Sequence, residues 1–334
     1  MASTSNTFSD IAALSAKEYY ERRSLEESEI KNGLLQYGVK SSIPEHESKT
    51  IHWHIWDKFA LAADVAETAE PSAIAANASE IDATLIEFSS YISIPIFGDK
   101  VRMKSLIEES YDKFREQASR TANARIMDSL VLGSNGVAGN DFSALTKRYC
   151  GGAAGFADLA TSAHAFNSKD MQRSVAYVEQ NNPAAGAPVC VMDRFVKEQV
   201  LVNDQEFRDL IKFRKIDAFE KNEITFWAGA DIDFQADPQR EALASAGGAL
   251  GTYSTAGEVF TTFIFHPKAF GTVQLMGKGG LKPKFHVQNI SVTGATMTIG
   301  YRIPFKAAVL HSTWGVQLRS VCVGSSAIAS VTRT

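Results

Sequence analysis

Cysteine is scarce in this 334-residue chain, and the cysteines present are an odd number at wide spacings: Cys150, Cys190 and Cys322. A secreted disulfide framework uses an even number of cysteines, and a cysteine metal centre uses close pairs such as C-x-x-C. The sequence therefore argues against both classes and predicts reduced, mostly buried thiols.

Positive charge is also in short supply, with 34 Lys and Arg against 38 Asp and Glu and a formal net charge of −4. A protein that binds nucleic acid tightly through phosphates normally carries a basic surplus. No segment approaches the roughly 18 consecutive apolar residues of a membrane helix. The N-terminus has no basic start followed by an apolar run. We expect no tight nucleic-acid binding, no membrane anchor and no secretion.

The familiar motifs of catalysis and cofactor binding are missing as well. The stretches GSNGVAGND and GGAAGFADL lack the Gly-Lys-Ser/Thr ending that holds phosphate, and no G-x-S-x-G presents a nucleophilic serine. One alternative stays open, a metal-dependent enzyme built around His52 and His54, since both would lie on one strand face. The other histidines are isolated. We therefore expect no catalytic residue, no cofactor and no metal.

What the chain does contain begins with a polar, charged and helix-prone segment over residues 1–48. Its apolar positions are too sparse to build a core, so it is interpreted as an arm that lies on another surface, such as a second copy. For the first dozen residues a disordered tail is an equal alternative.

Residues 49–61 alternate strictly, with Ile51, Trp53 and Ile55 on one face and His52, His54 and Trp56 on the other. This period of two predicts a strand, and residues 83–97 predict a second one. Between Phe59 and Gly98 the chain carries acids and no Lys or Arg. Two strands with so long an acidic connection suit a hairpin that projects from a domain and needs a neighbour.

Residues 103–132 give the strongest helical pattern, with apolar residues three and four apart and charge pairs such as Glu109–Lys113 on the other side. The pattern stops at Gly133. About thirty residues at roughly 1.5 Å each predict a rod of about 45 Å. Such length favours a spine, because the helix is too polar for a membrane and holds no sustained heptad.

The remainder predicts short alternating elements. A helix over 168–180 would be capped by Ser168 and end before Pro183. Strands are expected at 187–192, 223–229, 258–265, 290–310 and 314–323, and helices at 193–201 and 266–276.

In this order the elements resemble the major capsid proteins of tailed bacteriophages with the Hong Kong ninety-seven-type fold. The segments YYERRSLEESEIKNGLLQYGVKSSIP, TIHWHIWDKFALAADVAETAEPS, VFTTFIFHPKAFGTV and YRIPFKAAVLHSTWGVQLRS are most similar to the branch of coliphage N-four. The resemblance implies an α+β fold. It would comprise an N-terminal arm (1–48), an extended β loop (49–100), a peripheral domain (101–185) with its spine helix (103–132), an axial domain (186–290) and return strands (291–334).

The resemblance also implies a function: self-assembly into the icosahedral head that encloses double-stranded DNA, without catalysis or sequence-specific binding. The expected partners are further copies in hexamers and pentamers, a separate scaffolding protein, a portal and a decoration protein. Assembly would take place in the host cytoplasm, and the product is the virion capsid. The implied inter-subunit contact residues are Trp53, Trp56, Asp64, Glu67, Glu70, Glu80, Arg102, Arg115 and Arg120.

Two features bear on this resemblance. In some family members a lysine on the extended loop forms a covalent cross-link between subunits. Here no lysine lies between Lys58 and Lys100, so no such cross-link is expected. An encapsulin-type compartment, which has the same fold and encloses enzymes in place of a genome, stays open as an alternative.

Overall fold

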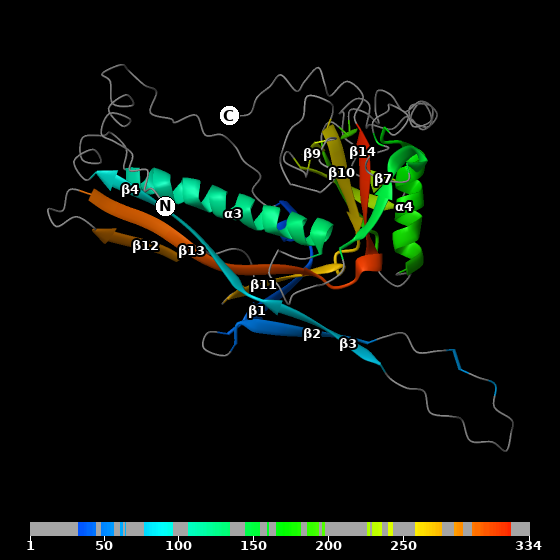
Figure 1. Cartoon of the computed structure of the whole chain (residues 1–334), viewed down its shortest axis with the longest axis horizontal. Coiled ribbons are helices and arrows are strands. Elements are labelled where there is room, and N and C mark those ends of the chain that lie inside the picture. The colour runs from blue at the N-terminus through cyan, green and yellow to red at the C-terminus, as the bar shows by residue number, and fades with distance from the viewer. Residues whose placement is uncertain are drawn as a thin grey trace.

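The computed structural model describes the chain in segments that together cover both sheets and the principal helices (Figure 1). The described residues are 33–44, 48–56, 61–62, 64, 77–95, 106–133, 144–153, 159, 165–181, 186–193, 196–197, 226–227, 229–235, 240–242, 258–275, 284–289 and 296–321. Most of the predicted arm over 1–48 lies outside these residues. Its described part, Gly33–Gln36 and Val39–Ile43, packs on the same chain and not on a second copy, with Leu34 and Ile43 buried.

One sheet has five strands around the long strand β13 (Thr296–Val309). On one side β13 pairs antiparallel with β4 (Ile86–Pro95). On the other side it pairs antiparallel with β12 (Lys284–Asn289) and with β11 (Phe270–Leu275). Strand β1 (Val39–Ile43) then adds to β11 in parallel.

Helix α3 (Leu106–Leu132) lies along one face of this sheet and confirms the predicted long helix within the described residues. Its buried side chains repeat every four residues, at Phe114, Ala118, Ala122, Ile126 and Leu130. They pack against the odd-numbered residues of β13, which are buried from Ile299 to Val309. Burying each large apolar side chain stabilises the fold by roughly 1.5–3 kcal/mol, so this contact forms the main core.

Two glycines fix the surroundings of α3 through their backbone geometry. Gly133 has φ 77° and its N–H donates to the Ser129 carbonyl at 3.0 Å, so the predicted stop is a left-handed C-terminal cap. A 3₁₀ turn, η1 (Gly33–Gln36), is bound to the helix because the Leu34 N–H donates to Asn123 Oδ1 at 2.6 Å. A Cβ on Gly33 would collide with that oxygen, so only glycine fits.

The second sheet has seven strands and brings together segments from most of the chain. Its order is β5 (Thr146–Tyr149), β14 (Gly315–Val321), β10 (Glu258–Phe265), β6 (Val189–Asp193), β8 (Ala230–Gln235) and β7 (Phe226–Trp227), with β9 (Arg240–Ala242) beside β10. Helix α4 (Ser168–Asn181) packs on one face through Met171, Val175 and Val178. The 3₁₀ turn η2 (Cys150–Gly152) follows β5.

The cap of α4 differs from the prediction. Asn167, not Ser168, accepts a hydrogen bond from the Asp170 N–H at 2.8 Å, while Ser168 is the buried first residue of the helix. Asparagine and serine cap about equally well, so the pattern alone could not separate neighbours.

The predicted helix over 266–276 is wrong. Residues His266–Ala269 form a turn, in which the Ala269 N–H donates to the His266 carbonyl at 2.8 Å, and β11 follows. The spacing of apolar residues there fits either period, and Thr272 and Val273 are β-branched residues that favour strands.

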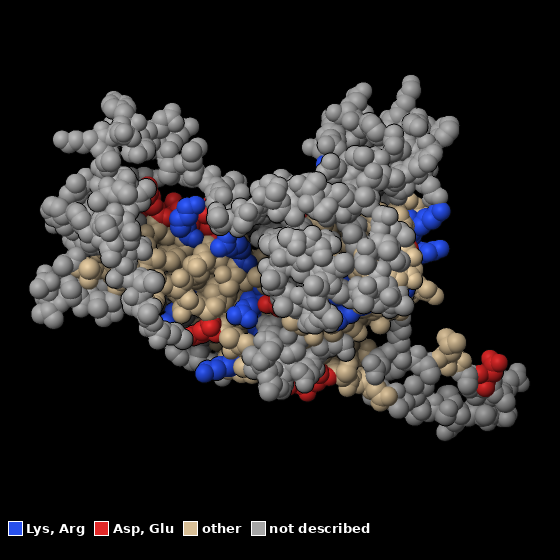
Figure 2. Space-filling model, turned by 45° about the horizontal axis from the view of Figure 1, so that its top comes forward, with Lys and Arg blue, Asp and Glu red and all other residues tan. Residues whose placement is uncertain are grey.

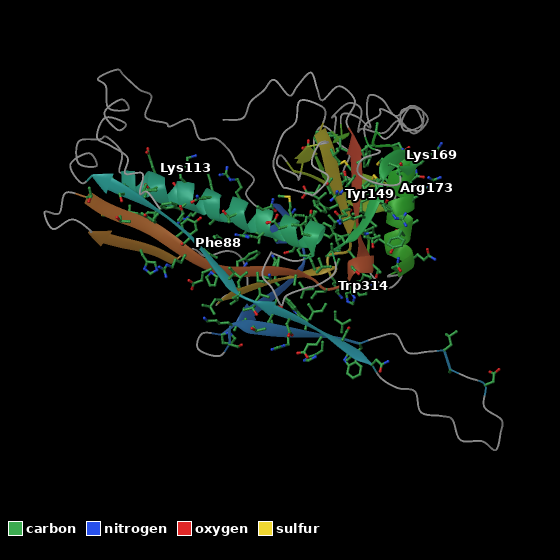
Figure 3. All side chains as sticks on the ribbon, viewed as in Figure 1. Phe88, Lys113, Tyr149, Lys169, Arg173 and Trp314 are labelled. Carbon is green, nitrogen blue, oxygen red and sulfur yellow. The ribbon has the colours of Figure 1, made fainter. Side chains whose placement is uncertain are left out.

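Two adjacent chain connections link the five-stranded sheet to the seven-stranded sheet. One is the turn His266–Ala269 between β10 and β11, and the other is the 3₁₀ turn η5 (Ser312–Trp314) between β13 and β14. The His266 N–H donates to the Trp314 carbonyl at 2.9 Å, and the His311 ring stacks on Trp314 at 3.7 Å. Trp314 lies at this junction in Figure 3. The junction couples the two sheets through backbone hydrogen bonds and aromatic contacts.

A third tie between the sheets involves the end of η1. The Asp233 carboxylate of β8 accepts hydrogen bonds from Gln36 Nε2 at 2.9 Å and from the Tyr37 hydroxyl at 3.2 Å. Burial and the nearby Asp233 carboxylate raise the pKa of Tyr37. The hydroxyl therefore stays protonated and serves as a donor.

No helix of the described residues is long and apolar enough to cross a membrane.

Candidate functional site

A two-stranded hairpin stem formed by β2 (Thr50–Trp56) and β3 (Ala78–Thr84) extends away from the five-stranded and seven-stranded sheets (Figure 1). The strands are antiparallel, and the register runs from Thr50 opposite Thr84 to Trp56 opposite Ala78. The predicted first strand is confirmed over Thr50–Trp56. The predicted second strand, at 83–97, is in fact two strands: the end of β3, which pairs with β2, and β4, which joins the main sheet.

The inner face of the stem is anchored on its own subunit. Ile51, Trp53 and Ile81 pack on a small core of Ile43, Ala83, Val273 and Ala308. The Trp53 indole N–H donates to Ser41 Oγ at 3.3 Å. A Cβ on Gly271 would lie 2.9 Å from the Trp53 ring, so the absence of a side chain at this position leaves room for the indole to pack there. The stem is therefore held at its base by contacts within one chain.

The outer face of the stem carries the polar and exposed members of the alternation. His52, His54 and Trp56 are exposed, and Trp56 keeps 66% of its surface accessible. The register sets Asp82 opposite His52 and Glu80 opposite His54. Trp53 and Trp56 thus lie on opposite faces, and only Trp56 is left for a partner.

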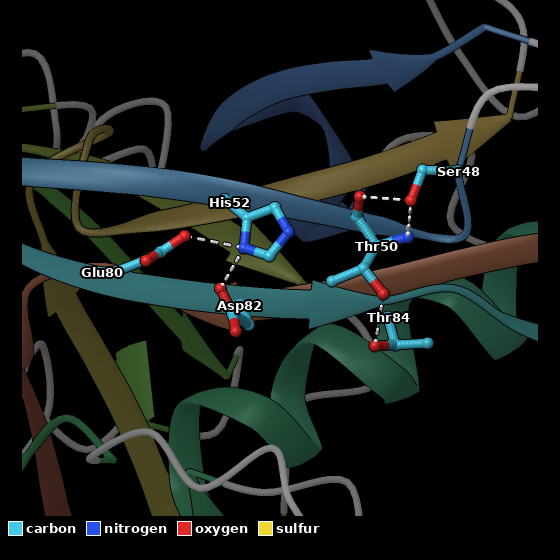
Figure 4. A network of polar contacts seen from close by, with 6 residues as sticks. All are labelled: Ser48, Thr50, His52, Glu80, Asp82 and Thr84. Atoms are coloured by element: carbon cyan, nitrogen blue, oxygen red, sulfur yellow. Dashed lines mark hydrogen bonds and ion pairs between the residues drawn. The ribbon is translucent and has the colours of Figure 1, made fainter.

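Polar contacts hold this face together (Figure 4). His52 Nδ1 lies 2.5 Å from Asp82 Oδ1 and 2.8 Å from Glu80 Oε1, with each of these side chains 50% exposed. Nearer the base, the Thr50 and Thr84 hydroxyls are 2.9 Å apart, and the Ser48 hydroxyl donates to the Thr50 carbonyl at 3.1 Å. Within the described residues, His52, Glu80 and Asp82 are the group whose geometry could hold a metal ion.

The outer side of α3 is charged but largely self-paired. Arg115 lies 3.3 Å from Asp112, and Lys113 lies 3.1 Å from Glu116, each pair three residues apart; Glu116 is half-buried and the other three side chains are exposed. Figure 3 shows Lys113 on the side of the helix away from the sheet, and Phe88 on β4. Such exposed pairs contribute about 0–1 kcal/mol each.

Basic and acidic side chains of the described residues are interspersed on the face drawn in Figure 2, without a large patch of one sign. This distribution agrees with the near-balanced composition. It favours contact with a surface of mixed charge over contact with a polyanion.

The hairpin and α3 occupy opposite faces of the five-stranded sheet. Ala307 belongs to the core under α3, whereas its neighbour Ala308 belongs to the core under the hairpin. Successive strand residues point to opposite faces. The outer surface of one element therefore cannot reach the outer surface of the other within one subunit.

The structure describes six of the residues predicted to contact other subunits. Trp53 is partly buried in the anchor; Trp56, Asp64, Glu80, Arg115 and Arg120 are exposed. Glu67, Glu70 and Arg102 lie outside the described residues. Sequence reasoning did not identify Ser41 and Gly271 as the seat of Trp53, nor Glu80 and Asp82 as partners of His52. The spacing of two between His52 and His54, and between Glu80 and Asp82, was visible, but not the register that joins them.

The buried thiols do not form a site. Cys150 and Cys190 are fully buried and in no disulfide, as predicted, whereas Cys322 lies outside the described residues. Burial raises the pKa of the Cys190 thiol. A thiol of this kind is a poor nucleophile because little thiolate is present near neutral pH.

Comparison with solved structures gives near full-length matches at low sequence identity. The capsid of Ralstonia phage GP4 matches with a TM-score of 0.65 and 11% identity, covering 96% of this chain and 99% of that chain. The cyanophage Pam1 capsid matches with a TM-score of 0.64 and 11% identity, covering 97% and 100%. The acid-stable capsid of Helicobacter pylori bacteriophage KHP30 matches at 0.62 and 11%, covering 95% and 98%.

This chain has the tailed-phage major capsid fold. No protein-family model and no curated protein sequence matches it. The capsid fold was predicted from the order of segments, and the matches confirm that part of the resemblance. The similarity extends over almost the whole of each chain.

Proposed function

We propose that this chain is the major capsid protein of a tailed phage, which assembles with copies of itself into the icosahedral shell around double-stranded DNA. The observation that carries the proposal is the capsid fold over 96% of the chain. Its plain consequence is a structural role with no reaction to catalyse.

The geometry of the hairpin supports assembly independently. A two-stranded hairpin is marginal by itself in water. Here its base is anchored by Trp53, while Trp56 remains 66% exposed on the other face. An anchored base combined with an exposed aromatic end is the arrangement expected of an element that completes its packing on a neighbour.

The opposite placement of the hairpin and α3 supports the same conclusion. Glu80, on the hairpin, and the exposed Arg115 and Arg120 of α3 belong to opposite sides of one sheet. Within a shell, the hairpin of one subunit would lie over the helix side of the next. We propose Trp56, Asp64, Glu67, Glu70, Glu80, Arg102, Arg115 and Arg120 as the inter-subunit contact set. Trp53, also expected there from the sequence, would act indirectly by holding the stem on its own subunit.

The finer assignments follow from the resemblance and remain our proposals. We assign residues 1–48 to the arm, 49–100 to the extended loop, 101–185 to the peripheral domain, 186–290 to the axial domain and 291–334 to the return strands. The proposed branch is that of coliphage N-four. The proposed assembly uses hexamers and pentamers, a separate scaffolding protein, a portal and a decoration protein, and yields the virion capsid in the host cytoplasm.

Deletion of the hairpin end tests the proposal. Replacing residues 64–76 with a short Gly-Ser linker leaves every β2–β3 pair from Thr50–Thr84 to Trp56–Ala78 in place. Co-expressed with its phage genes, the wild-type chain should form closed shells in electron micrographs, and the deletion variant should give folded, unassembled subunits. Intact shells from the deletion variant would contradict the role of the hairpin.

The contents of shells purified from the native source separate a phage head from an encapsulin-type compartment. Double-stranded DNA inside the shells would support our proposal. A protein cargo in place of DNA would replace it with the compartment, since both use the same fold.

A further inference from the structure

The outer face of the hairpin stem brings one imidazole and two carboxylates to a single point. His52 Nδ1 lies 2.5 Å from Asp82 Oδ1 and 2.8 Å from Glu80 Oε1. One ligand atom from each of the three residues lies within 4.8 Å of the other two. Figure 4 shows both carboxylates, from β3, converging on the ring nitrogen, from β2.

The strand register and the packing of the inner face both hold these three side chains together. Asp82 lies directly opposite His52 in the register, and Glu80 lies two residues along β3, so both carboxylates point to the same face. The inner face is held by Trp53 and Ile81 in their core, which prevents a slip of one residue. The Thr50–Thr84 hydroxyl contact holds the adjacent pair. The three donors therefore sit on a stem whose register is set before any ligand binds.

We propose that His52 Nδ1, Glu80 and Asp82 form a binding site for a divalent transition-metal ion, with Zn²⁺ as the probe. Zn²⁺ binds imidazole nitrogen and carboxylate oxygen at about 2.0–2.2 Å. Tetrahedral ligands at that distance are roughly 3.4 Å apart, so the side chains must separate by under about 1 Å from their present contacts. All three are half exposed and free to make that adjustment. Water completes the coordination.

The donor set selects the class of ion. One nitrogen and two carboxylates suit Zn²⁺ or Co²⁺, whereas Ca²⁺ and Mg²⁺ take oxygen ligands almost entirely. The ion would also relieve the repulsion between Glu80 and Asp82, which lie on one face of one strand. Binding uses the lone pair of Nδ1, so the ring would carry its proton on Nε2.

The ion would join β2 to β3, because His52 comes from one strand and both carboxylates come from the other. A two-stranded stem has few stabilising contacts of its own. The metal therefore acts as a cross-strand link, and its binding energy adds to the stability of the stem. This role is separate from the proposed shell function and can be measured on isolated subunits.

Binding is tested on the full chain, purified with a chelator and dialysed, by isothermal titration calorimetry with ZnCl₂ and by absorption of the Co²⁺ form. We expect one ion per chain, with visible d–d bands for Co²⁺ that Zn²⁺ abolishes. Removing even an outer-shell partner of a metal site typically costs 10–100-fold in affinity. His52→Ala and Asp82→Asn should therefore each weaken binding by about tenfold or more.

His54→Ala is the matched control, because His54 is an exposed histidine on the same face of the same strand. It should bind Zn²⁺ as the wild type does. An equal loss in His54→Ala would overturn the ligand set. Binding that survives the His52→Ala/Asp82→Asn double variant would place the ion elsewhere and overturn the site.

Hydrogen exchange of the stem amides gives a second readout. Binding of the ion at another position would not slow exchange in the stem. Zn²⁺ should slow exchange over 50–56 and 78–84 in the wild type and not in His52→Ala. No slowing, or no Zn²⁺ binding at millimolar concentration, would reduce the cluster to an ordinary ion pair and overturn the proposal. Shell formation is scored separately by electron microscopy, so either proposal can fail without the other.

Discussion

The five-stranded sheet under α3 and the hairpin stem beside it are both built from alternating strands, yet they complete their packing in different ways. In β13 the odd-numbered residues from Ile299 to Val309 are buried under α3 by the same chain. In β2 one face is anchored through Trp53, whereas the other leaves Trp56 66% exposed. The five-stranded sheet under α3, the body of the subunit, completes its packing within one chain, whereas the stem packs on its own chain with one face only. This difference is why we propose that the stem, and not the sheet under α3, contacts a neighbouring subunit.

The largest effect is expected for a cavity in the body. Leu130→Ala removes a fully buried side chain between α3 and β13, which should lower the free energy of unfolding by about 2–5 kcal/mol. Urea denaturation followed by circular dichroism measures it. Arg115→Ala, on the exposed side of the same helix, should stay within about 0.5 kcal/mol. Equal costs for the two variants would mean that α3 does not carry the core.

A smaller effect is expected at the joint between body and stem. Gly271→Ala places a methyl group 2.9 Å from the Trp53 ring and should cost about 1–3 kcal/mol through overpacking. Combining it with Trp53→Leu, which vacates the space, should cost less than the sum of the two single changes. Strict additivity in denaturation would show that the indole is not seated on this glycine.

Acid should weaken the junction between the sheets. Burial lowers the pKa of His311, and burial together with Lys268 lowers the pKa of His266. The unfolded chain, with histidine pKa near 6.5, takes up protons first. The stabilising contribution of the two neutral rings is therefore present above about pH 6.5 and is lost as the pH falls through that value toward the lower folded pKa.

Unfolding midpoints measured between pH 7.5 and 5.5 test this. His311→Phe keeps an aromatic ring for the stack on Trp314 and should flatten the loss of stability. A steeper slope in His311→Phe would mean that protonation of His311 stabilises the folded chain, which is the opposite of the expected effect.

The smallest effect on stability is expected at Trp56, where the effect on assembly should be large. Trp56→Ala removes an exposed side chain and should change the free energy of unfolding by less than about 0.5 kcal/mol. Shell yield by electron microscopy should nevertheless fall sharply. Trp53→Ala, three residues away, should instead destabilise the subunit. Normal shells from Trp56→Ala would remove the contrast between the two faces.

Much of the architecture was predictable because the periodic patterns were long. The alternation around Trp53 and Trp56 predicted the two faces of β2 correctly. The apolar residues spaced four apart from Phe114 to Leu130 identified α3. Short segments were less certain. Residues 266–276 fitted both periods, and Asn167 and Ser168 were equivalent caps until the backbone was known.

The candidate site shows the same division. His52, His54, Trp56 and Glu80 stood out from the sequence as candidate metal-ligating or inter-subunit contact residues. Their pairing did not, because the connection between the strands is long and no short turn sets the register. Nothing local could show that Asp82 faces His52 or that Gly271 receives Trp53.

The sequence by itself determined which residues alternate, which form a long amphipathic helix, and that charge and cysteine content suit neither a tight nucleic-acid binder nor a disulfide scaffold. These properties are local or compositional. Only the tertiary structure decided the register of β2 on β3, the seat of Trp53 on Gly271, and the placement of hairpin and helix on opposite faces of one sheet. Those depend on contacts between residues far apart in the chain, which packing selects and no local pattern encodes.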